Sequence, residues 1–481
     1  MAGRKYEVSR RQALGQIGVG LGAGLTAGLL PGCGLGPTVC GAPPPEAVPG
    51  SERDAQARAL LSNIDTFVVV MLENRSFDHL LGGLRLDRDY PSFKRITGLT
   101  GEEFNLDSTG RLVPIARMPG DGRGTFNPGH DWRSVRATFN EGRNDRFLTV
   151  NEDRREVMSY LARDQVPVFH ALADRYTVFD HWYASYMGQT WPNRYYLHAT
   201  TSGGRRENRP FDLDAPIGIW ERMAERCLSA RNYAAGSVLW YSVAFPARLW
   251  TGESAMVPGT IEDFFRDARA GNLPNFSLID PDFKVNDGYP MYSLLPCQAF
   301  VTSIVKAMAE SPQWSRSLLL ITFDEHGGYY DHIVPPQTTD LRTDFRQLGF
   351  RVPAIAIGPT VRQSAVVSTP LEHVSVAATL RARFGIETLS ERMDKTLDIS
   401  DCIDPALIDN PTPPPRDLEP VSFTSHLIAE LPHQRSSQPE IEAALAARRL
   451  PDGTVDPRST EERLQSWLRW AQELEAVKVR G

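Results

Sequence analysis

Two clusters of oxygen-bearing side chains have the residue types and spacing of a metal site. Asp324 and Glu325 come directly after one short apolar segment, and Glu73 and Asn74 come directly after another. Three acids brought into one site would repel one another unless a cation neutralised them. Because carboxylate and amide oxygens without thiolates suit hard divalent ions, these residues favour a site for one divalent metal ion.

The two apolar segments that precede these clusters are predicted to be buried parallel strands. Leu318 to Phe323 and Thr66 to Leu72 are apolar or β-prone and too short for helices. Gly327 and Gly328 then let the backbone turn. Ligands of open α/β sheets bind beyond the carboxyl ends of the strands, so we expect the oxygen donors at that edge. A solvated acidic turn is the competing interpretation of the second cluster taken alone.

Thr190 is a candidate nucleophile because of its position at a predicted helix start. Gly188 supplies a turn before it, and Pro192 is tolerated in the first helical turn, so Thr190 is predicted to be the N-cap. A hydroxyl at a helix N-terminus lies in a positive field, which suits attack on an anionic ester. A threonine that only caps the helix is the more common alternative.

The rest of the chain alternates between strand and helix patterns, as expected for a parallel sheet. The segment 166–181 is predicted to pass from helix to strand, and Phe276 to Ile279 and Val352 to Ile357 are further strands. A capping box at Thr369 predicts a helix that ends at Gly385. The predicted fold is α/β, a three-layer sandwich with a mainly parallel central sheet flanked by helices.

The first residues of the chain resemble an export signal. Arg10 and Arg11 precede a short Gly-rich apolar run, as in twin-arginine signals, and a sequence similar to a lipobox ends at Cys33. We therefore expect an exported protein that is periplasmic, anchored in the membrane as a lipoprotein, or secreted. A net charge of −7 argues against nucleic acid as a partner.

Six short motifs occur in the order seen in one known family. They are Glu73-Asn74-Arg75-Ser76-Phe77-Asp78-His79, Thr190-Trp191-Pro192-Asn193-Arg194, Phe323-Asp324-Glu325-His326-Gly327-Gly328, Tyr330-Asp331-His332, Arg351-Val352-Pro353-Ala354-Ile355 and Glu372-His373-Val374-Ser375. Together they resemble the bacterial phospholipase C and acid phosphatase phosphoesterase family, within the alkaline-phosphatase-like superfamily. The resemblance spans roughly residues 64 to 386.

The resemblance implies a fold and a metal-dependent chemistry. The fold would be the alkaline-phosphatase-like form of the three-layer sandwich. One divalent ion (Ca²⁺, Mg²⁺, Mn²⁺ or Zn²⁺) would be held by Glu73, Asn74, Asp324 and Glu325, with Thr190 as nucleophile and further ligand. Turnover would pass through a phosphothreonine intermediate.

Three residues are candidates for the acid that protonates the leaving group. Family members carry a histidine in the loop that corresponds to residues 286–290, and Tyr289 stands in its place here. His130 and His326 are the other candidates. An unperturbed tyrosine has a pKa near 10, which makes Tyr289 the weaker match to neutral pH.

The N-terminal signal pattern, the Pro/Gly-rich composition and the family resemblance together define the predicted domains and partners. The domains are a signal with a lipobox-like end at 1–32, a Pro/Gly-rich tether at 33–60, a phosphoesterase domain at 61–410, and a Pro-rich linker with a C-terminal helical extension at 411–481. The expected partner is a phosphate ester, in particular a phospholipid, and the membrane is expected only through a lipid anchor or the substrate. The oligomeric state stays open.

Three alternatives to a phospholipase C remain. An acid phosphatase would carry the same motifs. A sulfatase is disfavoured because its nucleophile is formylglycine made from Cys or Ser, and Thr190 cannot give that aldehyde. A non-catalytic surface lipoprotein that binds phosphorylated ligands is the most distant alternative.

Overall fold

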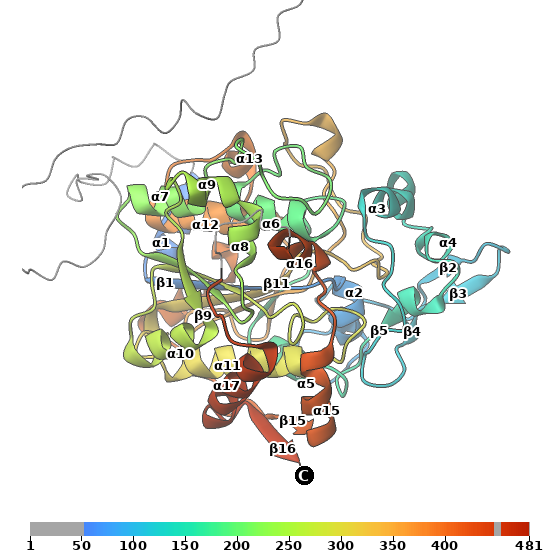
Figure 1. Ribbon diagram of the computed structural model, residues 1–481. Helices are drawn as coiled ribbons and strands as arrows, with labels where there is room; N and C mark the ends of the chain where they lie inside the picture. The colour runs from blue at the N-terminus through green and yellow to red at the C-terminus, as the bar shows by residue number, and fades with distance from the viewer. Residues whose placement is uncertain (1–51, 447–453, 481) are drawn as a thin grey trace, which may run out of the picture. The chain divides into compact units, whose positions relative to one another are not determined.

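A central eight-stranded sheet organises the computed structural model, which describes residues 52–446 and 454–480 (Figure 1). Only β12 in this sheet runs antiparallel to its neighbours, so the sheet is mainly parallel, as predicted. In order across the sheet the strands are β13 (Ala365–Val367), β6 (Thr177–Phe179), β12 (Ala354–Ile357), β11 (Ser317–Phe323), β1 (Thr66–Leu72), β10 (Phe276–Asp280), β8 (Ala230–Ala234) and β9 (Val257–Thr260).

The two strands that carry the acidic motifs are direct neighbours at the centre of the sheet. All seven residues of β1 and of β11 are buried, which explains why both read as continuous apolar runs. They pair in parallel with Leu72 opposite Phe323. Because the next residues are Glu73 and Asp324, this register delivers the two carboxylates side by side.

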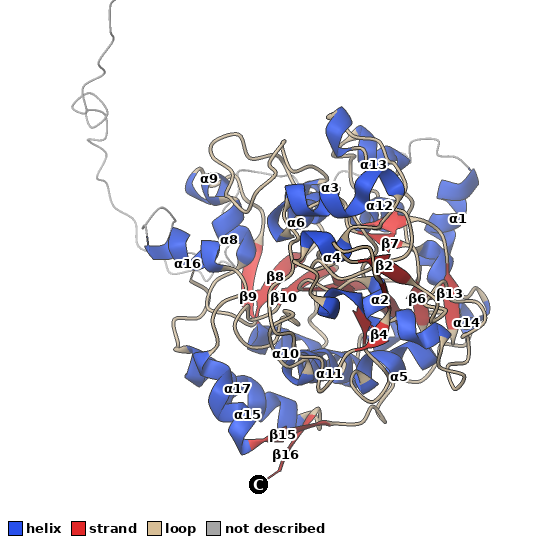
Figure 2. Cartoon of the chain, turned by 90° about the vertical axis from the view of Figure 1, so that its right-hand side faces the viewer, coloured by secondary structure: helices blue, strands red, loops and turns tan. Residues whose placement is uncertain are grey.

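Helices cover both faces of the sheet and complete the predicted three layers (Figures 1 and 2). One face carries α5 (Pro167–Arg175), α10 (Ile261–Ala270) and α11 (Leu295–Glu310), and α11 contacts both of the others. The other face carries α6 (Thr190–Ala199), α7 (Ile219–Glu225) and α12 (Val374–Phe384). Among the described helices, none is long and apolar enough to cross a bilayer.

A smaller group of elements projects beside the sheet and has an apolar cluster of its own. It contains the pairs β2 (Phe104–Leu106) with β3 (Leu112–Pro114) and β4 (Ala116–Arg117) with β5 (Ser159–Tyr160). The helices α3 (Trp132–Phe139) and α4 (Phe147–Val150) belong to it as well. This group matters for the site because His130 lies just before α3.

The C-terminal extension packs on the main body. Its strands β15 (Val421–Thr424) and β16 (Val477–Arg480) pair in parallel, and its last helix α17 (Thr460–Glu473) contacts α10 and α11. Ser459 and Glu462 form the capping box of α17. Between these elements lies α16 (Pro439–Ala446), preceded by a segment that reaches the carboxyl edge of the sheet.

Two predicted boundaries are wrong. The helix expected from Thr369 begins only at Val374, because Leu371 and Glu372 pair with β7 (Trp182–Tyr183) as the short strand β14. The tether predicted for 33–60 ends earlier, because Glu52–Leu61 forms α1. The Pro/Gly-rich composition stops at Gly50, and the following residues are mostly good helix formers.

The predicted signal, the lipobox-like sequence at Cys33 and residues 33–51 of the tether lie outside the described residues.

Candidate active site

The structure brings all five predicted metal and nucleophile residues together at the carboxyl ends of β1 and β11. The side-chain oxygen of Asn74 lies 3.1 Å from Glu73 Oε2, 3.1 and 3.2 Å from the two Asp324 carboxylate oxygens, and 2.9 Å from Glu325 Oε1. Thr190 Oγ1 lies 3.1 Å from Glu73 Oε2 and 3.4 Å from the Asn74 oxygen. Oxygens from five residues therefore converge on one point.

This convergence fits a divalent cation. The Asn74 amide oxygen faces only acceptors, which is unfavourable unless the amide turns over or a positive charge lies among the oxygens. The backbone N–H of Asn74 already donates to Asp324 Oδ1 at 2.8 Å. Hard oxygen ligands from carboxylates, an amide and a hydroxyl are the donor set of Mg²⁺, Ca²⁺ or Mn²⁺.

The electrostatics of the acids also favour a cation. Burial, with repulsion from Asp324, raises the pKa of Glu73 well above its usual value, and Arg194 opposes that rise. Burial likewise raises the pKa of Asp324. The pKa of Glu325 rises to about 8 through burial and Asp324, with His130 acting in the opposite direction. Because the pKa of Glu325 lies near 8, a metal ion bound there would displace its proton at neutral pH.

Close backbone contact locks the two ligand-bearing loops together. A Cβ atom on Gly327 would lie 2.1 Å from the carbonyl oxygen of Asn74, and Gly327 has φ +65°. Only glycine fits such a position. Asn74 itself has φ +61°, a left-handed conformation that asparagine tolerates better than most residues. The Gly327-Gly328 pair thus permits the close approach as well as the turn.

Thr190 is not the N-cap of α6, contrary to the sequence prediction. Gln189 is the cap, Thr190 is the first helical residue, and its side chain is only 1 % exposed. The hydroxyl donates to Glu73 instead of accepting a backbone N–H from its own helix. Thr190 therefore points into the acid cluster, which is the arrangement expected of a nucleophile.

Arg194 is a site residue whose role the sequence did not reveal. One turn along α6 from Thr190, its guanidinium donates to Glu73 Oε1 at 2.7 Å and to Asp280 Oδ1 at 2.9 Å. It also donates to the carbonyl oxygen of Met71 at 3.0 Å. Arg194 is almost wholly buried, so it fixes the Glu73 carboxylate and neutralises part of its charge.

His130, one of the three candidate acids, acts on the electrostatics of the cluster. It is half-buried, and it lowers the pKa of Glu325. His130 Nδ1 lies 2.7 Å from the carbonyl oxygen of Pro128, which assigns the Nδ1 proton to that bond and leaves Nε2 free.

His326 and Tyr289 are less suited to that role. The His326 ring is buried against Phe350, and burial lowers its pKa to about 3, so it stays neutral at neutral pH. Burial and Asp287 raise the pKa of Tyr289 above its usual value, which makes the phenol a more reluctant donor.

One further side chain reaches the cluster from the C-terminal extension. Gln438 Nε2 lies 2.8 Å from Glu73 Oε2 and 3.2 Å from Thr190 Oγ1. The predicted domain boundary at residue 410 therefore leaves part of the site outside the phosphoesterase domain. No local signal in the sequence could have found this residue, because it is 248 positions from Thr190.

A second acidic group, Asp78, Asp331 and His332, has its potential ligand atoms within 4.8 Å of one another. Arg351 donates to Asp78 Oδ1 and to Asp331 Oδ1, both at 2.9 Å, and all three of these side chains are fully buried. The guanidinium already supplies the positive charge there. We interpret the group as an ion-pair network that joins the loops following β1 and β11.

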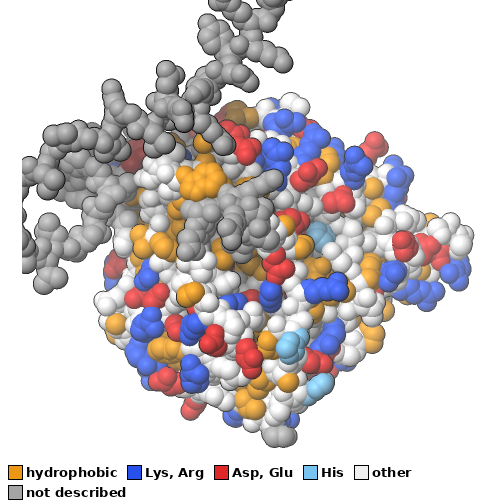
Figure 3. Space-filling model, in the orientation of Figure 1, with side chains coloured by type: hydrophobic (Ala, Val, Ile, Leu, Met, Phe, Trp, Pro, Cys, Tyr) orange, Lys and Arg blue, Asp and Glu red, His pale blue; other side chains and the backbone are white. Residues whose placement is uncertain are grey.

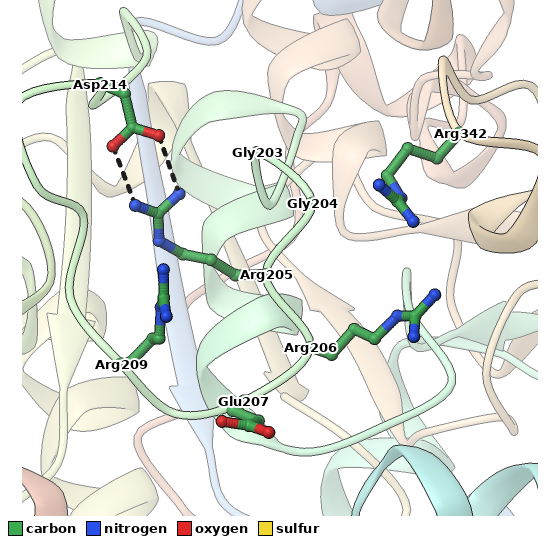
Figure 4. A pocket seen from close by; sticks show the side chains of 8 residues that line it. All are labelled: Gly203, Gly204, Arg205, Arg206, Glu207, Arg209, Asp214 and Arg342. Carbon is green, nitrogen blue, oxygen red and sulfur yellow. Dashed lines mark hydrogen bonds and ion pairs between the residues drawn. The ribbon is translucent and has the colours of Figure 1, made fainter. Parts of the chain in front are cut away.

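A separate hollow of about 420 Å³ lies along the loop after α6 (Figure 4). Four arginines line it: Arg205, Arg206, Arg209 and Arg342. Most of this charge is compensated, because Arg205 pairs with Asp214 while Arg206 and Arg342 pair with Asp344. The hollow is lined by neither Thr190 nor the acid cluster, so it is distinct from the candidate active site.

Comparison with known proteins finds similar chains. The chain is 30% identical over 378 residues to non-specific phospholipase C1 of Arabidopsis thaliana, which covers 68% of each chain. It is 28% identical over 385 residues to phospholipase C A of Mycobacterium tuberculosis, covering 68% of this chain and 74% of that one. Among solved structures, a protein in the alkaline phosphatase superfamily from Vibrio parahaemolyticus is 11% identical with a TM-score of 0.37, covering 73% of this chain and 79% of that one.

The profile of the Phosphoesterase family matches residues 64–387, nearly the same span as the motifs. The chain belongs to the Phosphoesterase family and is a hydrolase of phosphate esters.

Proposed function

We propose that this protein is a metal-dependent phosphoesterase of the phospholipase C type that uses Thr190 as its nucleophile. The observation that carries the proposal is the position of Thr190 Oγ1 among the oxygens of Glu73 and Asn74, at the edge of the sheet where Asp324 and Glu325 also meet. A hydroxyl that only stabilised the helix would have no reason to point into a buried acidic cluster.

The reaction proceeds in two displacements. The Thr190 hydroxyl loses its proton to solvent, Oγ1 attacks phosphorus, the bond from phosphorus to the leaving oxygen breaks, and a phosphothreonine forms. Water then attacks the phosphothreonine, the bond from phosphorus to Oγ1 breaks, and phosphate or a phosphomonoester leaves while Thr190 regains its proton. Each displacement faces a smaller barrier than direct attack by water would.

The residues of the site have separate roles in this reaction. The divalent ion, held by Glu73, Asn74, Asp324 and Glu325, would supply positive charge that favours the ionised hydroxyl and the anionic phosphoryl group. Glu73 accepts the hydrogen bond from Thr190 and so orients Oγ1. His130, protonated on both ring nitrogens, donates its Nε2 proton to the departing oxygen while Nδ1 stays bonded to the Pro128 carbonyl oxygen.

The choice of a phospholipid substrate rests on the relatives, whose names are those of phospholipases C. The aromatic residues around Thr190 do not contribute to that choice. Six of them could in principle have formed a cage for a choline head group, but all are core residues with at most 2 % exposure: Trp182, Tyr183, Tyr186, Trp191, Tyr195 and Tyr196. Figure 3 shows Lys and Arg interspersed with Asp and Glu on the visible face, which agrees with a substrate other than nucleic acid.

A substrate panel tests this proposal. The purified protein is assayed with added Mg²⁺, Ca²⁺ or Mn²⁺ on phosphatidylcholine in mixed micelles, on phosphocholine, on p-nitrophenyl phosphate and on a sulfate ester. We expect diester cleavage to exceed monoester cleavage, and Thr190→Ala to abolish both. Faster turnover of monoesters would make the protein an acid phosphatase, and no turnover of any ester would favour a binding protein.

We also propose export through the twin-arginine segment, on the residues Arg10 and Arg11. Replacing both with lysine should leave the precursor in the cytoplasm, whereas normal export would disprove this reading. Release from the membrane fraction by Cys33→Ala would test lipid anchoring.

A further inference from the structure

Three hydrogen bonds join Gln438 to Thr190, Glu73 and Trp191. Its Nε2 donates to Glu73 Oε2 at 2.8 Å and to Thr190 Oγ1 at 3.2 Å, and its Oε1 accepts from the indole N–H of Trp191 at 2.9 Å. The side chain is 1 % exposed. Donor and acceptor sides of the amide are therefore both used, in a buried site where an unpaired polar group would be costly.

The segment that carries Gln438 is anchored on both sides of it. Before it, the backbone N–H of Ser437 donates to the carbonyl oxygen of Phe283 at 2.7 Å, and the carbonyl oxygen of Arg435 accepts from the Tyr292 hydroxyl at 2.9 Å. These contacts join the segment to the loop that follows β10 (Phe276–Asp280).

After Gln438, the first turn of α16 is joined to the start of α6. Asn208 Nδ2 donates to Glu440 Oε1 at 3.2 Å, while Asn208 Oδ1 accepts from the backbone N–H of Trp191 at 2.9 Å. The residue next to the nucleophile is thus connected to the extension twice, through Gln438 and through Asn208. This second, independent contact fixes where the amide of Gln438 lies.

We propose that Gln438 is a further residue of the catalytic machinery, supplied by the C-terminal extension to hold Thr190 and Glu73. Its amide N–H groups orient the Thr190 oxygen, favour the ionised hydroxyl, and fix the Glu73 carboxylate in position. Trp191, which follows Thr190 in the chain, keeps the amide in this orientation by donating to its oxygen. Gln438 lies outside residues 64–387, which the family profile matches, so it reaches the site from the C-terminal extension.

The alternative is that the segment merely covers the site and must leave before a substrate enters. A cover needs shape and apolar surface, whereas Gln438 makes specific hydrogen bonds to the attacking oxygen and to a carboxylate. The two roles predict opposite effects of a substitution, because removing a cover raises kcat/KM and removing a positioning amide lowers kcat.

The inference rests on the proposed function, and three variants of the full chain test it. Gln438→Met keeps the size of the side chain and removes both donors. Gln438→Glu keeps an oxygen for Trp191, and its carboxyl can donate only while protonated. Glu442→Gln is the matched control, because it breaks the partly exposed Lys284–Glu442 ion pair of the same segment without touching the site.

For Gln438→Met we expect kcat to fall about tenfold to a hundredfold with KM changed by less than about threefold, since positioning interactions around a metal site have effects of this size. Its affinity for Mn²⁺, measured by titration without substrate, should also fall. Relative to the wild type at the same pH, Gln438→Glu should retain activity at acidic pH and lose it as pH rises, because the ionised carboxyl would repel Glu73. Glu442→Gln should behave as the wild type.

Several results would overturn the inference. Unchanged kcat and Mn²⁺ affinity in Gln438→Met would exclude a role for the amide, and a raised kcat/KM would identify the segment as a cover. An equal loss in Glu442→Gln would assign the effect to docking of the segment. If Gln438→Met does not fold, the pH profile of Gln438→Glu tests whether the amide of Gln438 positions Thr190 and Glu73. If the wild type cleaves no ester, the proposed function fails, and the Mn²⁺ titration still decides the role of Gln438.

Discussion

Replacing Arg194 with methionine should destabilise the protein strongly when no divalent metal is present. The guanidinium is 1 % exposed and bridges two fully buried carboxylates, Glu73 and Asp280. Its removal leaves both acids without their cation, a change that typically costs about 3–5 kcal/mol. Asn232, which donates to Asp280 at 3.1 Å, compensates only a small part of that loss.

The size of the thermal shift follows from the length of the chain. At roughly 2 cal/mol/K per residue, 481 residues give an unfolding entropy of about 1 kcal/mol/K. A loss of about 3–5 kcal/mol therefore lowers Tm by about 3–5 °C. Scanning calorimetry in a chelating buffer measures this shift, and Arg269→Met, which breaks an exposed pair with Glu473, should change Tm by less than about 1 °C.

Two further measurements identify the cause of the Arg194 effect. Adding Mn²⁺ should reduce the difference from the wild type, because the cation neutralises Glu73. Combining Arg194→Met with Asp280→Asn should recover stability relative to Arg194→Met alone, since one stranded charge is gone. A Tm within about 1 °C of the wild type for Arg194→Met, or strictly additive effects in the double variant, would refute the argument that the guanidinium balances these two acids.

Three other predictions concern the chemistry of the site. Thr190→Ala should abolish turnover, and Thr190→Ser should retain part of it. Acid quench and mass spectrometry of the wild type should find phosphate on Thr190. Near-normal activity of Thr190→Ala would instead identify a water molecule as the nucleophile. Metal binding should release protons and become tighter as pH rises toward 8, because the raised pKa of Glu325, about 8, leaves a proton that the cation must displace at lower pH. Calorimetric titrations at pH 6 and pH 8, each in two buffers of different ionisation enthalpy, measure this, and equal affinity at both pH values would contradict it. His130→Ala should slow cleavage of alkyl esters about a hundredfold or more but slow p-nitrophenyl esters far less, because only a poor leaving group needs the proton; an equal loss for both esters would remove His130 from this role.

Much of the site was predictable because its signals are local in the chain. The buried strands β1 and β11 read as short apolar runs, and their ends place Glu73, Asn74, Asp324 and Glu325 at the sheet edge where ligands bind. The type of each side chain was enough to predict a divalent metal, and the structure places all four together with Thr190.

The exact geometry around Thr190 could not be predicted from propensity alone. A threonine before a turn of helix reads as an N-cap, but tertiary contact with Glu73 takes the hydroxyl away from the helix end and shifts the cap to Gln189. Similarly, the helix expected from Thr369 loses its first turn to a strand pairing with residues that lie far earlier in the chain.

The choice between the candidate acids also needed the fold. The sequence alone does not distinguish His130 from His326 as the proton donor. Only the structural environment of each ring distinguishes them. Burial among aromatic rings lowers the pKa of His326 to about 3, whereas His130 is half-buried and lowers the pKa of Glu325. Burial and neighbouring charge set a pKa, and neither is written in the local sequence.

The sequence by itself determined the class of fold and predicted a metal-binding edge and a candidate nucleophile, because strand patterning and the residues that end each strand are local properties. Only the tertiary structure decided that β1 and β11 lie in register, that Arg194 bridges Glu73 and Asp280, and that Gln438 joins the site. These contacts link residues between 86 and 365 positions apart in the chain. Such distant pairs depend on how the whole sheet, its helices and the C-terminal extension pack, since no local pattern encodes which remote side chain fills a given buried position.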